Sequence, residues 1–207
     1  MTYGPIGPIV ITMSLGRPQE FNYEKVLDAA TELFWRNGFE STSMSELLSA
    51  TGLSKSSLYQ SFGGKSELFQ KCLENYSSSM TRQLLDNLSR AESGITFIEA
   101  LLNSAAEEAG GKLRPKGCLI MNTATEFSRK DTAVLGYVEK GISEFKRIFS
   151  LALAKAQSKN EIPQEKDINQ LSSYLVGVMS GIRAMVKGGI SEDEAKVIIK
   201  IAVHSLM

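Results

Sequence analysis

The sequence contains little of the material from which catalytic and metal sites are made. Its 207 residues include one histidine, His204, and two cysteines, Cys72 and Cys118. A Ser-His-Asp arrangement would have to use His204, and no serine lies in the strand-turn-helix setting of a hydrolase nucleophile. The glycine pairs fall between predicted helices, without a phosphate-loop or dinucleotide-binding pattern. We therefore expect neither an enzyme nor a metal or other cofactor.

The chain also lacks net charge, long apolar runs and a disulfide framework. Its 23 Lys and Arg balance 23 Asp and Glu, which excludes a broadly basic protein that wraps nucleic acid but leaves room for a small local footprint. No apolar run approaches the ~20 residues of a membrane span. The short apolar run at residues 5–11 follows no positive charge, so we expect no signal peptide. Two thiols in a chain of this size are typical of a reduced, cytoplasmic protein.

What the sequence does contain is helical periodicity. Apolar residues make up 43% of the chain, enough for a core, and after Phe21 they recur at spacings of three and four rather than two. We predict an all-α protein of nine helices with no sheet. The predicted helices are one through Val26–Phe34, two short ones at 43–52 and 54–62, and further ones at 65–90, 95–109, 118–128, through Val134–Ala152, at 164–187 and at 192–206.

Local signals mark the ends of several of these helices. Ser43 and Glu46 have capping-box spacing, as do Ser191 and Glu194. Gly52 suits the left-handed position after a helix, and Ser54 can cap the next one. Two short helices joined through a glycine have the dimensions of a helix-turn-helix. On spacing alone, an ordinary helical hairpin with serine caps fits equally well.

The residues themselves favour the first alternative. From Gly52 to Phe69 the chain reads G-L-S-K-S-S-L-Y-Q-S-F-G-G-K-S-E-L-F, and from Asn37 to Leu47 it reads N-G-F-E-S-T-S-M-S-E-L. Both runs resemble the DNA-binding segment of the TetR (tetracycline repressor) family of transcription regulators. The resemblance covers about residues 19–80 and is most specific at four positions. These are Gly52, Tyr59, Phe62 and Lys65.

The resemblance implies a domain organisation. Residues 1–18 would be a disordered leader or arm, in which residues 1–12 could be an extension preceding a true start at Met13. Residues 19–79 would form the DNA-binding domain, with the helix-turn-helix motif at 43–62. Residues 80–207 would form an effector-binding and dimerisation domain.

The resemblance also implies DNA contacts. Thr42 and Ser43 would contact phosphate, Ser54 would cap the recognition helix, and Tyr59 and Lys65 would reach the backbone. The remaining expected contacts are base edges for Lys55, Ser56, Ser57 and Gln60, and the backbone or minor groove for Arg17. One departure is Leu48, where many members have alanine. Residues 13–71 hold six basic and seven acidic side chains, so non-specific DNA affinity should be weak.

A dimer is expected from two helices near the C-terminus. Small residues recur along one face of the helix at 164–187, and the last helix is apolar on more than one side. One side can cover the chain's own core, and the other suggests a second subunit. A monomer whose core takes both faces is the alternative. The expected interface residues are Ser173, Gly177, Ser180, Gly181, Ala184, Val197, Ile198 and Ile201.

In the resembling family the C-terminal half holds a small-molecule cavity. The run G-C-L-I-M-N-T-A-T-E-F from Gly117 to Phe127 resembles a segment of one branch of these regulators. Cys118, at a predicted helix start near Lys116 and Arg114, could alternatively act as a redox or electrophile sensor. The candidate lining residues are Phe97, Leu101, Cys118, Met121, Glu126, Phe127, Tyr137, Phe145, Tyr174, Met179 and Arg183.

These observations lead to one expected function. The chain should be a cytoplasmic homodimer that binds a palindromic operator in double-stranded DNA and is released by a small-molecule effector. Repression is the family default. The alternatives are a helical partner-binding module without DNA activity and a version of the regulator that senses through Cys118.

Overall fold

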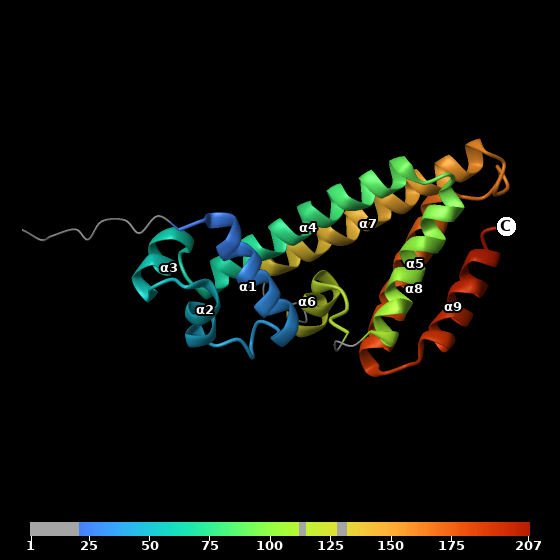
Figure 1. Ribbon diagram of the computed structural model, residues 1–207. Helices are drawn as coiled ribbons and strands as arrows, with labels where there is room; N and C mark the ends of the chain where they lie inside the picture. The colour runs from blue at the N-terminus through green and yellow to red at the C-terminus, as the bar shows by residue number, and fades with distance from the viewer. Residues whose placement is uncertain (1–20, 112–114, 128–131) are drawn as a thin grey trace, which may run out of the picture.

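The computed structural model describes residues 21–111, 115–127 and 132–207. Within these ranges it contains nine α-helices and no strand, as predicted (Figure 1). Arg17 and the proposed leader lie outside the described residues. The helices are α1 (Tyr23–Asn37), α2 (Met44–Thr51), α3 (Lys55–Phe62), α4 (Lys65–Arg90), α5 (Gly94–Gly110), α6 (Leu119–Phe127), α7 (Thr132–Ser158), α8 (Ile168–Gly188) and α9 (Glu192–His204).

The local signals act as the sequence indicates. Ser43 and Glu46 form a capping box at α2, and Ser191 and Glu194 form another at α9. Gly52 ends α2 in the left-handed conformation, with φ 70° and ψ 10°. A side chain is disfavoured in that conformation, so the glycine allows the sharp turn into α3.

The start of α8 was predicted wrongly, four residues too early. The helix begins at Ile168, because the carboxylate of Asp167 accepts hydrogen bonds from the Asn169 and Gln170 amides at 2.7 and 3.3 Å. The preceding segment is held in a non-helical form by Gln157. Its side-chain amide donates to the carbonyl oxygens of Pro163, Gln164 and Lys166 at 3.0 to 3.2 Å.

The first three helices and the first two turns of α4 form what we call the N-terminal unit, whose buried residues are continuous with the core of the rest of the chain. Phe34 on α1 and Phe69 on α4 meet edge to face at 4.9 Å between ring centroids. The short α2 contributes Leu47, and α3 contributes Leu58 and Phe62, all of them buried. Because α2 and α3 have only eight residues each, this shared core rather than their own hydrogen bonds must hold them in place.

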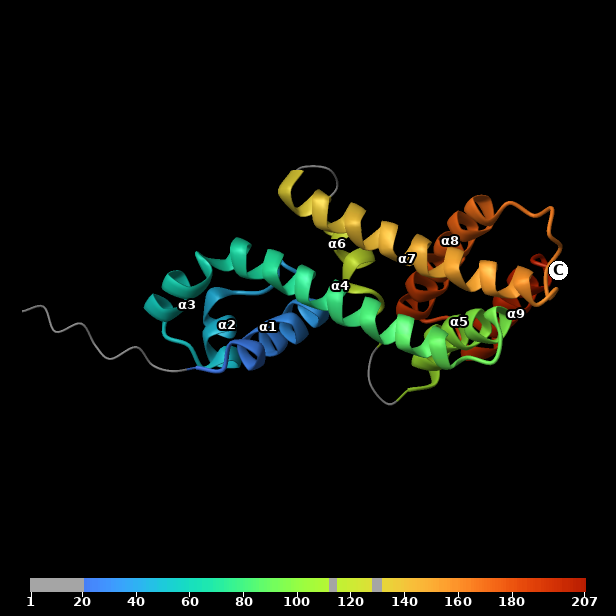
Figure 2. The same cartoon turned by 90° about the horizontal axis from the view of Figure 1, so that it is seen from above.

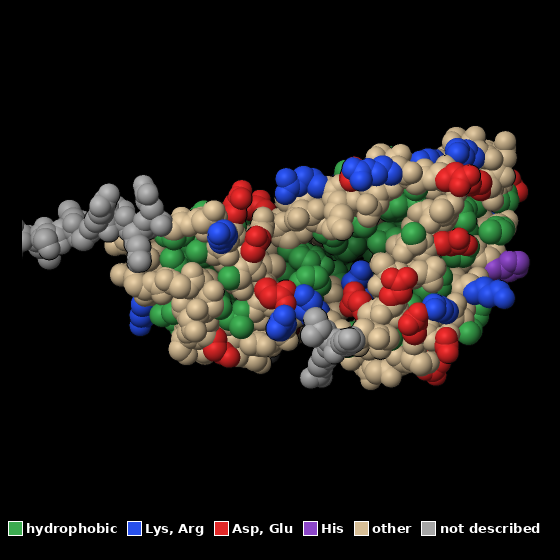
Figure 3. All heavy atoms as spheres, in the orientation of Figure 1, with side chains coloured by type: hydrophobic (Ala, Val, Ile, Leu, Met, Phe, Trp, Pro, Cys, Tyr) green, Lys and Arg blue, Asp and Glu red, His purple; other side chains and the backbone are tan. Residues whose placement is uncertain are grey.

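The rest of α4 and helices α5–α9 form what we call the C-terminal half. Helices α4 and α7 run lengthwise and pack against each other, while α5, α8 and α9 gather at the end far from α3 (Figure 1). Helix α6 lies between α1 and the end formed by α5 and α8 in Figure 1, and Figure 2 shows it beside α7, which it contacts. The face seen in Figure 3 carries both acidic and basic side chains, and apolar side chains show in the hollow between the N-terminal unit and the C-terminal half.

Candidate functional site

The exposed face of α3 is the first candidate site. Leu58 and Phe62 lie four residues apart on one side of the helix and are buried, which fastens α3 to the core of the N-terminal unit. The opposite side therefore faces outward. Lys55, Ser56 and Gln60 are all exposed there, as the sequence predicts for residues that contact base edges.

Three serine hydroxyls gather at the first turn of α3. The Ser54 hydroxyl accepts a hydrogen bond from the Ser57 amide at 3.1 Å. It also lies 3.0 Å from the Ser56 hydroxyl and 2.8 Å from the Ser57 hydroxyl. Small donors and a helix N-terminus at one place make a surface that a phosphate or a base edge can approach closely.

Two further expected contacts lie at the other end of α3. Tyr59 is 49% exposed, and its ring lies beside Gly64, where an added Cβ would be 3.5 Å from Cε1. The Lys65 ammonium sits 4.4 Å from the centre of the Phe39 ring. Lys65 is the first residue of α4, so Lys65 and the Tyr59 ring both lie near the end of α3.

The start of α2 differs from the expectation at Thr42. This residue is fully buried, and its hydroxyl donates to the Gly38 carbonyl at 2.6 Å. It cannot contact a phosphate in this conformation, because its donor is used inside the α1–α2 turn. Ser43 is exposed, although its hydroxyl is engaged with Glu46 in the capping box. Leu48, the departure from the family pattern, is half-buried against the core.

A second candidate surface lies on α8 and α9. Val197 and Ile201, one turn apart on α9, are 59% and 64% exposed. On α8, a Cβ added at Gly177 or Gly181 would meet nothing within 4 Å, so these glycines leave a smooth open strip. Ser173 and Ala184 are also exposed, while Ser180 and Ile198 are half-buried. Tyr174, which was predicted to line the cavity, and Met185 are exposed large apolar side chains of the same helix.

A third candidate site is a closed cavity inside the C-terminal half. It encloses only about 10 Å³. This is at the lower limit of the volume that holds one water molecule, about 10–15 Å³. Five predicted lining residues converge on it, and three residues that the sequence analysis missed complete the wall. The predicted members are Cys118, Met121, Phe145, Met179 and Arg183, and the others are Phe149, Val176 and Ser180.

Arg183 is the charged group at this cavity. Its Nη1 donates to the Glu108 carboxylate at 2.9 Å and to the Gly117 carbonyl at 3.4 Å. Its Nε is buried and has no hydrogen-bond partner among the described residues. A buried donor without an acceptor is unfavourable. A ligand in the cavity that offered a hydrogen-bond acceptor to this nitrogen would therefore be stabilised.

The other six predicted lining residues do not line this cavity. Phe97 and Leu101 are buried in the core on α5. Tyr137 lines a groove beside Leu73 on the α4–α7 surface. Tyr174 is exposed, and its hydroxyl accepts a hydrogen bond from Ser205 at 3.4 Å. The last two, Glu126 and Phe127, face the N-terminal unit instead.

The two thiols are both buried. Burial raises the pKa of Cys72 to about 12. Cys118 accepts a weak hydrogen bond from the Tyr76 hydroxyl at 3.9 Å, and burial raises the pKa of that tyrosine. The sequence placed Lys116 near Cys118 as a cation that could activate the thiol. Its ammonium instead pairs with Glu32 at 2.8 Å and lies over the Trp35 ring at 4.1 Å. Arg114 lies outside the described residues.

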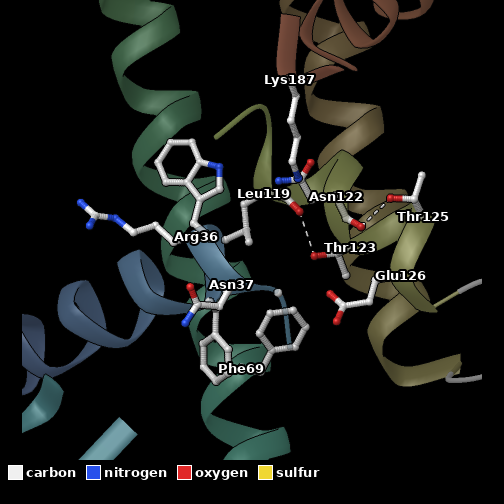
Figure 4. Close-up of a pocket in the computed structure, with 12 residues that line it drawn as sticks. Arg36, Asn37, Phe69, Leu119, Asn122, Thr123, Thr125, Glu126 and Lys187 are labelled. Atoms are coloured by element: carbon white, nitrogen blue, oxygen red, sulfur yellow. Dashed lines mark hydrogen bonds between the residues drawn. The ribbon is translucent and has the colours of Figure 1, made fainter. Parts of the chain in front are cut away.

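A cleft of about 290 Å³ separates the end of α1 from α6. Figure 4 shows Glu126 and Asn122 of α6 on one side and Asn37 and Phe69 on the other. Unlike the closed cavity, this cleft has walls from both parts of the molecule. Its lining residues lie far apart in the sequence, and only Glu126 was singled out there.

Among the helices of the described residues, none combines the length and the apolar character needed to cross a membrane. The same residues contain no group of three or more His, Cys, Asp or Glu side chains that could hold a metal ion.

Comparisons with known proteins place this fold. The family model of the bacterial regulatory proteins of the tetR family matches residues 26–72, and that of the tetracyclin repressor-like C-terminal domain matches residues 94–197. The HTH-type transcriptional repressor ComR of Escherichia coli K12 is 28% identical over 189 residues, which cover 89% of this chain and 88% of ComR. The HTH-type transcriptional regulator YezE of Bacillus subtilis 168 is 29% identical over 162 residues, 78% of this chain and 84% of YezE.

Solved structures show the same architecture. A cysteine mutant of the TetR family regulator CifR, complexed with 26-bp double-strand operator DNA, superimposes with a TM-score of 0.81 at 23% identity and covers 93% of this chain and 100% of its own. The reduced form of E. coli NemR gives a TM-score of 0.79 at 20% identity, with 86% of this chain and 93% of NemR covered. Because the two family models together span both halves of the chain, the protein belongs to the TetR family and is a DNA-binding transcriptional regulator.

Proposed function

We propose that this regulator is a homodimeric repressor that binds a palindromic operator through α3 and leaves it when a small molecule enters the C-terminal half. The observation that carries the proposal is the placement of α3, which is anchored by Leu58 and Phe62 and presents Lys55, Ser56 and Gln60 outward. A short helix fixed on one side and polar on the other can enter the major groove. Ser57, which is half-buried, is the remaining proposed base contact. Ser43, Tyr59 and Lys65 would position the helix on the DNA backbone, and Ser54 caps it.

The balance of charge indicates how binding would work. The region from residue 13 to 71 has one more acidic than basic side chain. Broad electrostatic attraction to DNA is therefore weak, and affinity must come from a few placed contacts repeated in two subunits. Two copies of α3 about one helical turn of DNA apart would then require a palindromic site.

The surface of α8 and α9 supports the dimer. Gly177 and Gly181 let another helix approach closely, and Val197 and Ile201 offer apolar area that water otherwise contacts. A two-fold axis through this surface would pack α8 and α9 against the same helices of a second copy. The division of the chain near residue 79 is part of this proposal, and it falls inside the continuous helix α4.

The cavity beside Cys118 and Arg183 is the proposed effector site. It is closed in this conformation, so a ligand must push its walls apart, and the flexible side chains of Met121 and Met179 would allow this.

ComR is named a repressor and CifR was solved with operator DNA. These relatives support repression and operator binding by this chain. Because its operator would lie in the cytoplasm, we place the protein there.

The test is selection of DNA fragments by the purified protein, followed by titration of the selected operator with variants. Lys55→Ala should weaken binding of the dimer by about 30-fold or more, because each of the two subunits loses one base contact of about 1–3 kcal/mol. Tyr59→Phe should weaken it less, because only a hydroxyl is removed. Lys140→Ala, an exposed lysine on α7, is the matched control and should leave affinity unchanged.

Two outcomes would contradict the DNA part of the proposal. One is the absence of any selected sequence, which would favour a partner-binding module. The other is equal affinity for Lys55→Ala and wild type. The dimer is tested separately by sedimentation of Gly181→Trp, whose side chain would block the smooth strip of α8. Wild type should sediment at twice the 22.6 kDa chain mass, and the variant should shift toward the single chain.

A further inference from the structure

Helix α6 is fastened to the N-terminal unit at both of its ends. Before its start, the Gly117 carbonyl accepts a hydrogen bond from the Trp35 indole at 3.1 Å, and Lys116 pairs with Glu32 at 2.8 Å. Burial alone would raise the pKa of Glu32, but its hydrogen bonds to Lys116 and Arg36 outweigh it and lower that pKa. These contacts tie the start of α6 to the C-terminal part of α1.

At the other end of α6, Glu126 holds the turn between α1 and α2. Its Oε2 accepts the Phe39 amide at 3.0 Å, and its Oε1 accepts the Glu40 amide at 2.7 Å. One carboxylate thus receives two consecutive backbone donors, which is a charge-assisted contact stronger than a neutral hydrogen bond. Figure 4 shows Glu126 reaching from α6 toward the end of α1.

The turn itself is shaped for this contact. Gly38 has a φ of 82°, a left-handed value that side chains disfavour. A Cβ there would lie 3.0 and 3.1 Å from the two carboxylate oxygens of Glu126. A glycine at this position therefore serves both the backbone conformation and the close approach of the carboxylate.

The turn is rigidly joined to α2. The Thr42 hydroxyl donates to the Gly38 carbonyl at 2.6 Å, and the Thr42 amide donates to the Phe39 carbonyl at 3.2 Å. The capping box of α2 begins at the next residue. The Phe39 ring lies 5.2 Å from Phe127 of α6 and 5.0 Å from Phe69 of α4. Any change in the position of Glu126 must therefore reach the first helix of the helix-turn-helix.

We propose that Glu126 is a positioning residue for DNA binding. Its carboxylate is bound to the α1–α2 turn, and through the turn it would fix the angle at which α2 and α3 meet the operator. This inference rests on the proposed function. It adds a route from α6 to the DNA-binding surface that passes through the turn rather than along α4.

Two variants separate the charge of Glu126 from its reach. Glu126→Gln keeps the length but replaces one acceptor oxygen by an NH2 group, which faces a backbone N–H. Glu126→Asp keeps the charge but shortens the side chain by one carbon. Glu139→Gln, an exposed carboxylate on α7, is the matched control. Full-length dimers of each are compared with wild type.

The readouts are amide hydrogen exchange at Phe39 and Glu40, affinity for the operator selected by the wild type, and the thermal midpoint. In both Glu126 variants we expect the two amides to exchange about tenfold faster and operator affinity to fall about tenfold, as for one lost charge-assisted hydrogen bond. The thermal midpoint should fall by only a few degrees, and the dimer mass should not change. Glu139→Gln should match wild type in every measurement.

The outcomes distinguish the inference from the function on which it rests. Wild type that selects no DNA would overturn the proposed function, and with it the role of Glu126. Wild type that binds its operator, together with Glu126 variants that bind equally well despite faster exchange at the two amides, would overturn the inference alone. Unchanged exchange at both amides would also overturn it, because the contact would then not hold the turn.

Discussion

The N-terminal unit and the C-terminal half present their functional residues in different ways. In the N-terminal unit, the candidate residues lie within one short helix and its neighbours in the sequence, so a local run such as Ser54–Gln60 contains most of the surface. In the C-terminal half, the cavity is made by Cys118, Phe145 and Arg183, which come from distant parts of the chain. The comparison teaches that a surface built on one helix is visible in sequence, whereas a cavity needs the packing of several.

The largest effect should come from a close helix contact in the C-terminal half. Gly94 opens α5 against α7, where an added Cβ would clash with the Ala152 carbonyl and lie 2.7 Å from the Ala156 amide nitrogen. Backbone atoms cannot move aside as a side chain can, so we expect Gly94→Ala to lower the free energy of unfolding by about 3 kcal/mol or more. Urea unfolding monitored by circular dichroism measures this. Wild-type stability in the variant would show that α5 and α7 can separate freely.

A glycine of the N-terminal unit should behave differently. Gly52 has a φ of 70°, but a Cβ there would meet nothing within 4 Å. Gly52→Ala should therefore cost only the conformational strain, about 1–2 kcal/mol. The same unfolding experiment gives the value, and operator titration should show a loss of affinity because the turn between α2 and α3 is altered. A cost equal to that of Gly94→Ala would remove the contrast between local and packed positions.

Two matched caps sharpen the comparison further. Ser43→Ala removes the cap of α2, and Ser191→Ala removes the equivalent cap of α9. Each should lower stability by about 1 kcal/mol, since both serines satisfy an orphan amide at a helix start. Only Ser43→Ala should also weaken operator binding in an anisotropy titration. Equal losses of DNA affinity in both variants would indicate that the caps act through overall stability.

The smallest expected effect is the change in thermal stability at acid pH. Hydrogen bonds from Ser43 lower the pKa of Glu46, and hydrogen bonds from Ser191 lower the pKa of Glu194, in each case from the ordinary value of 4.5. A carboxylate with a depressed pKa in the folded state stabilises the protein above its unfolded pKa, and this contribution is lost as the pH falls through the folded value. The difference in thermal midpoint between wild type and Glu46→Gln or Glu194→Gln should thus shrink below pH 4.5. A difference that stays constant to pH 3 would contradict the capping role.

Much of the fold could be predicted from the sequence because its helix boundaries are chemically marked. The caps at Ser43, Ser54 and Ser191 and the left-handed Gly52 are where the sequence puts them. The error at α8 arose where the boundary depends on a contact from elsewhere. Gln157 holds the residues before Ile168 out of the helix from a position on α7, and no local signal shows this.

The site residues could also be predicted where their placement depends on one helix, and not where it depends on contacts in the folded chain. The exposure of Lys55, Ser56 and Gln60 follows from the opposite placement of Leu58 and Phe62 on one helix turn. Thr42 was misplaced because its hydroxyl finds an acceptor in the folded turn. Six of the eleven expected lining residues lie away from the cavity, since helical periodicity tells which face is buried but not which neighbour that face meets.

The sequence by itself determined the all-α class, the nine segments, the helix-turn-helix and the resemblance to a family, because periodicity and caps depend on residues a few positions apart. Only the tertiary structure decided that the cavity is closed around Arg183, that Thr42 is internal, and that Glu126 of α6 binds the turn before α2. The Glu126 contact joins residues more than eighty positions apart, and the cavity likewise gathers residues from several helices; such contacts are set by the packing of whole helices rather than by any local pattern.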